Sequence, residues 1–148
     1  MFTSAAFRNG TGGSGIAICA AGETVRVIRR AVLASSPVEV AYRALLHGLW
    51  RARTTGTRHV RAYVDNAHLA AQLGGSEDVP PELTGLYLQI RALLNAYRWS
   101  RVEFLPRAQN AEAAIAAVEA LDQDPRLHEE DLDAPEPLPL FSSAGSTT

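Results

Sequence analysis

A helix start at Ser36 divides this sequence into two parts with different patterns. Before it, Phe2–Ala5, Gly15–Ala20 and Thr24–Leu33 are apolar or β-branched segments separated by turn residues, which predicts three antiparallel strands. After it, helical and strand patterns alternate along the chain. This order predicts an α/β fold: a five-stranded mixed sheet of three antiparallel strands and then two parallel βα units, with helices on both faces.

The first helix has a well-defined beginning. Ser36 fits the N-cap position, Pro37 the first helical position and Glu39 the third, which together form a capping box. The apolar residues that follow have helical spacing to about Arg53. We therefore expect Glu39 to act as a capping residue.

The second part of the sequence contains five further elements. Turn residues, glycine pairs and prolines bound each of them. In chain order, we expect a strand at His59–Val64, helices at Asn66–Leu73 and Pro81–Tyr97, a strand at Arg101–Leu105, and a helix at Asn110–Leu121. Asn110 is a candidate N-cap of the last helix.

Charge separates the sequence into a body and an acidic end. Residues 1–121 contain 13 arginines and nine acidic residues, whereas residues 122–148 contain one arginine and seven acidic residues. We expect residues 1–121 to form one domain and residues 122–148, which are rich in proline and serine, to be disordered. A mildly basic body is compatible with nucleic-acid binding.

Other features of the sequence concern its compartment. No apolar run approaches the roughly 18 residues that span a membrane, and no signal-peptide pattern is visible at the N-terminus. Cys19 is the only cysteine, which excludes an internal disulfide and fits a reducing environment. We expect a cytoplasmic protein without a membrane partner.

Four stretches of the chain carry a resemblance to a known family. They are Thr3–Ala17 (Thr-Ser-Ala-Ala-Phe-Arg-Asn-Gly-Thr-Gly-Gly-Ser-Gly-Ile-Ala), Ala41–Leu45 (Ala-Tyr-Arg-Ala-Leu), Asp65-Asn66 with Gln72-Leu73, and Leu105–Ala117 (Leu-Pro-Arg-Ala-Gln-Asn-Ala-Glu-Ala-Ala-Ile-Ala-Ala). In this order and spacing they resemble the type 1 ribonuclease H family, over residues 2 to about 121. The resemblance implies the ribonuclease H-like fold.

The resemblance also implies a chemistry, and the sequence departs from it. Family members hydrolyse the RNA strand of an RNA–DNA hybrid with two Mg²⁺ ions, which four carboxylates hold. By position these carboxylates correspond to Ser4, Ala41, Asp65 and Ala114, so only Asp65 remains. Hard divalent ions need several anionic oxygens, and neutral side chains do not replace them. We expect no bound metal beyond a weak ion at Asp65, and Mg²⁺ or Mn²⁺ as a cofactor only if the domain is active.

Two questions about acidic residues stay open at this point. Asp65 is either a remnant of the catalytic set or a plain cap between a strand and a helix. Glu39, Glu103 and Glu112 are the acids that could substitute for the lost carboxylates. Glu39 and Glu112 lie on other faces of their helices and Glu103 lies inside a strand, away from its end, which argues against all three.

A second set of candidates concerns nucleic-acid contacts. The loop after the first strand resembles the family's hybrid-binding turn, where glycines let the backbone approach RNA 2′-hydroxyls. A flexible hairpin connection and solvated arginines are the structural alternatives. The candidate nucleic-acid-binding residues are Arg8, Asn9, Gly10, Thr11, Gly12, Arg43 and Arg107.

Three functions follow, and the first is our leading hypothesis. The domain is a non-catalytic ribonuclease H-like module that binds nucleic acid, as an RNA–DNA hybrid or RNA, or a protein partner. Alternatively, it is an active ribonuclease H with an atypical site. The third hypothesis is an assembly module that forms a homodimer through the Pro81–Tyr97 helix or a sheet edge.

Overall fold

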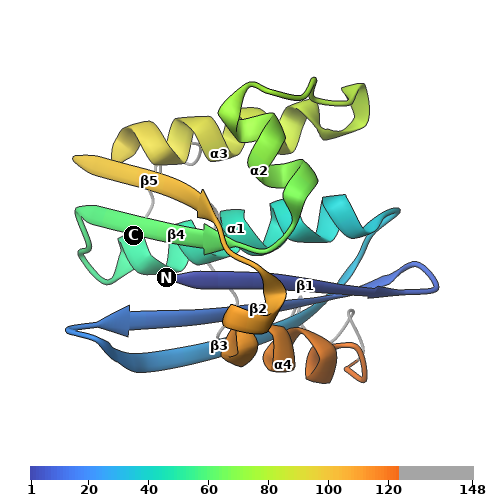
Figure 1. The fold of residues 1–148 in the computed structure, drawn as a ribbon, viewed down its shortest axis with the longest axis horizontal. Helices are drawn as coiled ribbons and strands as arrows, with labels where there is room; N and C mark the ends of the chain where they lie inside the picture. The colour runs from blue at the N-terminus through green and yellow to red at the C-terminus, as the bar shows by residue number, and fades with distance from the viewer. Residues whose placement is uncertain (124–148) are drawn as a thin grey trace, which may run out of the picture.

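The computed structural model describes residues 1–123, and its elements follow the predicted order (Figure 1). They are β1 (Phe2–Arg8), β2 (Thr11–Ala20), β3 (Glu23–Leu33), α1 (Pro37–Thr54), β4 (His59–Val64), α2 (Ala67–Gly74), the 3₁₀ turn η1 (Pro81–Leu83), α3 (Thr84–Ala96), β5 (Trp99–Phe104), the 3₁₀ turn η2 (Arg107–Gln109) and α4 (Ala111–Ala120). The acidic segment that we expect to be disordered lies almost wholly outside the described residues.

The five strands form one mixed sheet in the order β3-β2-β1-β4-β5. Strands β1, β2 and β3 are antiparallel neighbours, whereas β4 pairs in parallel with both β1 and β5. This arrangement confirms the predicted fold class. The parallel pairing of β1 with β4 has a functional consequence, because it brings the carboxyl ends of the two strands to the same edge of the sheet.

Glycines in β2 show which helix covers which face of the sheet. A Cβ added to Gly12 would meet the side chain of Val40 in α1, whereas one added to Gly13 would overlap the carbonyl oxygen of Ala117 in α4. Because successive strand residues point to opposite faces, α1 and α4 lie on opposite sides of the sheet. α3 packs on α1, and most of the apolar core lies on that side.

The connection between β1 and β2 corrects a prediction. Asn9 and Gly10, with φ of 53° and 80°, form a two-residue turn, and Arg8 pairs directly with Thr11. The connection is thus a tight hairpin turn, in which two residues with positive φ match the twist of the flanking strands, and β2 begins at Thr11 rather than at the predicted Gly15. Gly12 is already inside β2 and buried against α1.

Helix α1 begins as the capping box predicts, with one difference. The Ser36 hydroxyl accepts a hydrogen bond from the Glu39 N–H at 3.2 Å. The Glu39 carboxylate accepts from the N–H of Ser35 at 2.9 Å, one residue before the N-cap. These two hydrogen bonds satisfy backbone N–H groups at the start of the helix, so Glu39 has the capping function that the sequence indicates.

The remaining boundaries differ from the predictions by a few residues. The helix expected from Pro81 begins as the 3₁₀ turn η1, and α3 proper starts at Thr84. Strand β5 starts at Trp99, two residues before its predicted start. Within residues 1–123, no helix combines the length and the apolar character that crossing a membrane requires.

The contact between β2 and α4 leads to a prediction about stability. Substituting Gly13→Ala would place a methyl group against the α4 backbone, and we expect it to lower the free energy of unfolding by about 1–3 kcal/mol. The control is Gly85→Ala in α3, where an added Cβ meets open space and should stabilise by up to about 1 kcal/mol. Urea denaturation followed by circular dichroism measures both, and equal stabilities would contradict the close contact.

Candidate functional site

The ends of β1 and β4 bring two sequence-predicted residues together. Thr3 pairs with Val64, so the next residues, Ser4 and Asp65, lie side by side at the edge of the sheet. The Ser4 hydroxyl donates a hydrogen bond of 2.7 Å to Oδ2 of Asp65. Ser4 is buried, and only 3% of the Asp65 side chain is exposed.

Two further residues, both from the segment that leads into α4, complete the surroundings of Asp65. The Asn110 amide nitrogen donates to Oδ2 of Asp65 at 2.9 Å and to the carbonyl of Thr3 at 2.7 Å. Arg107 donates to the carbonyl of Ala5 at 2.9 Å, and its Nη1 lies 3.8 Å from the same Asp65 oxygen. The carboxylate therefore accepts two hydrogen bonds and has a cation beside it.

This geometry corrects two predictions about caps. Asn66, rather than Asp65, caps α2, because its side chain accepts the Leu69 N–H at 2.9 Å. Asn110 occupies the N-cap position of α4, but its side chain makes no capping bond and bridges Thr3 and Asp65 instead. The bridging role of Asn110 was not predicted from the sequence. Its match to an asparagine in the family motif was the available signal.

The two helical positions of the expected carboxylate set carry methyl groups. Ala41 lies in α1 and is buried in the apolar core. Ala114 lies one turn after Asn110 in α4, and its N–H bonds to the Asn110 carbonyl. Neither residue can supply an anionic ligand. Of Ser4, Ala41, Asp65 and Ala114, only Asp65 carries a carboxylate.

Glu39, the first candidate substitute, is engaged at the start of α1. Its carboxylate accepts from the Ser35 N–H and forms an ion pair of 2.9 Å with Arg43, one turn later. Burial raises the pKa of Glu39, but the Ser35 hydrogen bond and the Arg43 charge outweigh burial and hold the pKa below its usual value. Glu39 is thus an ionised capping residue.

The other two candidate substitutes are engaged elsewhere as well. Glu103 forms ion pairs with Arg101 at 2.8 Å and Arg61 at 3.5 Å, across β4 and β5. Glu112 accepts a hydrogen bond of 2.6 Å from Thr24 on β3. These contacts direct the three carboxylates to three different parts of the domain.

The donor set can be compared with the two-metal centre that the resemblance implies. Such a centre needs several anionic oxygens that converge on two cations. Within residues 1–123, no group of three His, Cys, Asp or Glu side chains is placed to hold a metal ion. Oδ2 of Asp65 is already occupied by hydrogen-bond donors. The residues present do not fit the two-metal centre, and we derive no step through it.

The candidate nucleic-acid residues fall into two groups. Arg8 and the turn residues Asn9 and Gly10 are exposed at the tip of the β1–β2 hairpin, where Arg8 forms an ion pair of 3.2 Å with Asp122. Gly12, by contrast, lies inside β2 and is buried against α1, away from the exposed turn.

The remaining candidate nucleic-acid residues also lie in different parts of the domain. Thr11, half-buried, pairs with both Arg8 and Leu33 in the sheet. Arg43 forms an ion pair with Glu39 and lines the groove between α1 and α3, whereas Arg107 lies beside Asp65. Arg8 and Arg107 are thus the predicted arginines that lie nearest the carboxyl half of β1.

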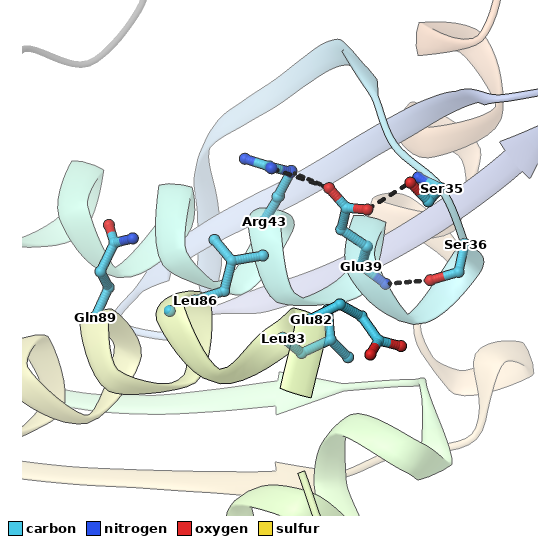
Figure 2. Close-up of a pocket in the computed structure, with 9 residues that line it drawn as sticks. Ser35, Ser36, Glu39, Arg43, Glu82, Leu83, Leu86 and Gln89 are labelled. Carbon is cyan, nitrogen blue, oxygen red and sulfur yellow. Dashed lines mark hydrogen bonds and ion pairs between the residues drawn. The ribbon is translucent and has the colours of Figure 1, made fainter. Parts of the chain in front are cut away.

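A groove lies between α1 and α3, beside the candidate residues Glu39 and Arg43 (Figure 2). It has a volume of about 530 Å³ and lies between the start of α1 and the first turns of α3. Figure 2 shows that Glu39 is already bonded to Ser35 and Arg43, with Glu82 across the groove. Its charged groups stabilise the helix start, and we assign no chemistry to it.

The bridge through Asn110 leads to a prediction. Substituting Asn110→Ala removes the donor to both Thr3 and Asp65, and we expect it to lower the free energy of unfolding by about 2 kcal/mol because buried acceptors lose a partner. The matched control is Asn95→Ala on the exposed side of α3, which should change stability by less than about 0.5 kcal/mol. If urea denaturation gives the same value for both variants, the bridge does not stabilise the domain.

Comparisons with known proteins agree with the geometry. The sequence profile of the family described as "Reverse transcriptase-like" matches residues 3–120. The bifunctional protein Rv2228c of Mycobacterium tuberculosis and an uncharacterized protein, Mb2253c, of Mycobacterium bovis are each 34% identical over 82 residues. These residues are 55% of this chain and 22% of either relative, so the chain corresponds to a small part of both.

Solved structures show the same fold. Ribonuclease H1 from Halobacterium salinarum is 25% identical with a TM-score of 0.74, over 82% of this chain and 95% of that one. The N-terminal ribonuclease H domain of Rv2228c is 26% identical with a TM-score of 0.74, over 82% and 94%. A ribonuclease H1 named LC11, in complex with an RNA/DNA hybrid, is 21% identical with a TM-score of 0.75, over 82% and 94%. The chain therefore belongs to the reverse transcriptase-like family and has the ribonuclease H-like fold.

Proposed function

We propose that this ribonuclease H-like domain binds nucleic acid, as an RNA–DNA hybrid or structured RNA, without hydrolysing it. The observation that carries the proposal is the environment of Asp65. Its carboxylate accepts hydrogen bonds from Ser4 and Asn110 and lies 3.8 Å from Arg107, while Ala41 and Ala114 carry methyl groups. This is the environment of a structural carboxylate.

Hydrolysis of a phosphodiester needs charge stabilisation that this arrangement does not supply. In the two-metal mechanism, two cations stabilise both the attacking water and the leaving oxygen. A single buried aspartate that already accepts hydrogen bonds does not hold such a pair of cations. Glu39, Glu103 and Glu112 interact with Ser35, Arg101 and Thr24 in other parts of the domain. These contacts disfavour the hypothesis of an active enzyme with substitute ligands.

Two observations support nucleic acid as the partner. Arg8 and Arg107 lie along the carboxyl half of β1, where cations can contact phosphates and the exposed Asn9-Gly10 turn presents backbone groups. A protein of the same fold, LC11 ribonuclease H1, is known in complex with an RNA/DNA hybrid. The fold therefore has a surface on which such a duplex fits.

The proposal predicts the outcome of a cleavage assay. The full chain, incubated with a labelled RNA–DNA hybrid and Mg²⁺ or Mn²⁺, should cleave no faster than the buffer blank, because three of the four carboxylate positions are neutral. Denaturing gel electrophoresis measures the products. Metal-dependent cleavage that disappears in Asp65→Asn would refute the proposal.

A variant with four carboxylates tests the proposal independently, through metal binding rather than cleavage. Combining Ser4→Asp, Ala41→Glu and Ala114→Asp recreates the set of four around Asp65. Because like charges repel, the metal-free variant should melt at a lower temperature than the wild type, and Mn²⁺ or Mg²⁺ should raise that temperature. The wild type should show no such metal dependence.

Binding of the hybrid is predicted to depend on Arg8. Arg8→Ser should reduce the slope of log affinity against log salt by about 0.9, as expected for one lost phosphate contact. The control is Arg26→Ser, which removes an exposed arginine from β3, on the other side of the sheet's centre. Fluorescence anisotropy with a labelled hybrid measures both. Binding that does not respond to salt would favour the assembly hypothesis.

A further inference from the structure

A second basic surface lies at the opposite end of the sheet from Asp65. It consists of the arginines around the starts of β4 and β5 and the ends of α1 and α3, on the left in Figure 1. We call it the arginine end, and its members are Arg53, Arg58, Arg61, Arg98 and Arg101. Arg58 is separated from Asp65 by the length of β4, roughly 20 Å for an extended strand.

Backbone contacts hold these arginines together. The N–H groups of Arg98 and Trp99 both donate to the carbonyl of Arg58, at 2.9 and 3.3 Å. Arg61 and Arg101 are direct partners in the pairing of β4 with β5. Arg61 and Arg101 therefore share one face of the sheet, and Arg58 and Arg98 lie beside it at the same end, although these pairs are about 40 residues apart in the sequence.

The charge of the arginine end is almost unopposed. Glu103 is the single acidic residue in residues 40–64 and 83–111, and it bonds to both Arg61 and Arg101. Five arginines and one glutamate leave four positive charges in excess. Arg58 and Arg98 are exposed, and 61% of the Arg101 side chain is exposed. Such a surface attracts a polyanion.

Aromatic side chains accompany the arginines. Trp99 at the start of β5 is 42% exposed, and the Arg61 guanidinium lies 5.6 Å from the centre of its ring. Two residues after Arg61, on the same face of β4, Tyr63 stacks on Phe2 with ring centres 4.9 Å apart. Exposed aromatic rings among arginines bind unpaired bases by stacking, which a duplex does not permit.

A hollow of about 250 Å³ lies beside this surface, at the end of α1. Its lining includes Arg53 and Arg58, which can only donate hydrogen bonds, and the buried Trp50. The indole nitrogen of Trp50, another donor, has no hydrogen-bond partner within the described residues. Arg53 already donates to the carbonyl of Ala96 at 2.8 Å, so the exposed Arg58 is the donor that this hollow offers to a phosphate group.

We propose that the arginine end binds single-stranded nucleic acid, with phosphates at Arg58 and Arg98 and a base against Trp99. The unopposed positive charge and the exposed indole carry this inference together, because an acidic protein segment would use the arginines but not the ring. The site is separate from the surface beside Asp65, and the inference does not rest on hybrid binding there.

The test uses the full chain and a fluorescein-labelled oligothymidylate of about 15 nucleotides. Arg58→Ser should weaken binding about threefold or more at low salt and reduce the salt slope by about 0.7. Trp99→Leu should weaken binding about tenfold and abolish the quenching of tryptophan emission by the oligonucleotide. The charge-matched control, Arg26→Ser, should behave like the wild type.

Three outcomes would overturn the inference. They are the absence of oligothymidylate binding, an equal effect of Arg58→Ser and Arg26→Ser, and displacement by a polyglutamate peptide without any change in Trp99 emission. The last outcome would identify the partner as an acidic protein segment. Measuring hybrid binding by the same variants separates the two sites, because Arg8→Ser should affect the hybrid and Arg58→Ser the single strand.

Discussion

The contact of α4 with strand β2 is the constraint on which the candidate site depends. Because Gly13 and Gly15 have no side chains, the α4 backbone at Ala113 and Ala117 lies directly against the strand. This close packing fixes the start of the helix, and with it Asn110, over the end of β1. Side chains at the two glycines would displace the helix, and the 2.9 Å bond from Asn110 to Asp65 would be lost.

The negative charge of a buried aspartate such as Asp65 can be compensated in two different ways, by metal ions or by hydrogen-bond donors. A buried carboxylate is costly unless hydrogen-bond donors or cations compensate its charge. In a two-metal site the compensation comes from cations, so the neighbours must be further anions. In this domain it comes from Ser4, Asn110 and Arg107, so the neighbours are donors. One set of neighbouring residues cannot consist of anions that bind metal ions and of donors that bind the carboxylate. Around Asp65 all three neighbours are donors.

Short sequence patterns predict the helices and strands, whereas contacts between distant residues determine the roles of Gly12, Gly13 and Asn110. The bounds of β4 and the cap of α1 follow from strand periodicity and from a capping box, which act within a few residues. Gly12 and Gly13 suggested a loop, because glycine favours turns locally. Their place in β2 depends on helices that begin at residues 37 and 111. Asn110 likewise looked like a cap, although its partners, Thr3 and Asp65, are 107 and 45 residues away.

The neutral side chains of Ser4, Ala41 and Ala114 also affect the electrostatic field of the domain. Residues 1–121 carry a net charge of +4, and carboxylates at Ser4, Ala41 and Ala114 would reduce it to +1. In an enzyme, bound metal ions neutralise such a cluster and allow phosphates to approach. Here the three neutral side chains have the same effect without a metal. A domain with neutral side chains at these positions therefore attracts a polyanion at any metal concentration, which is the physical basis of the metal-independent binding that we propose.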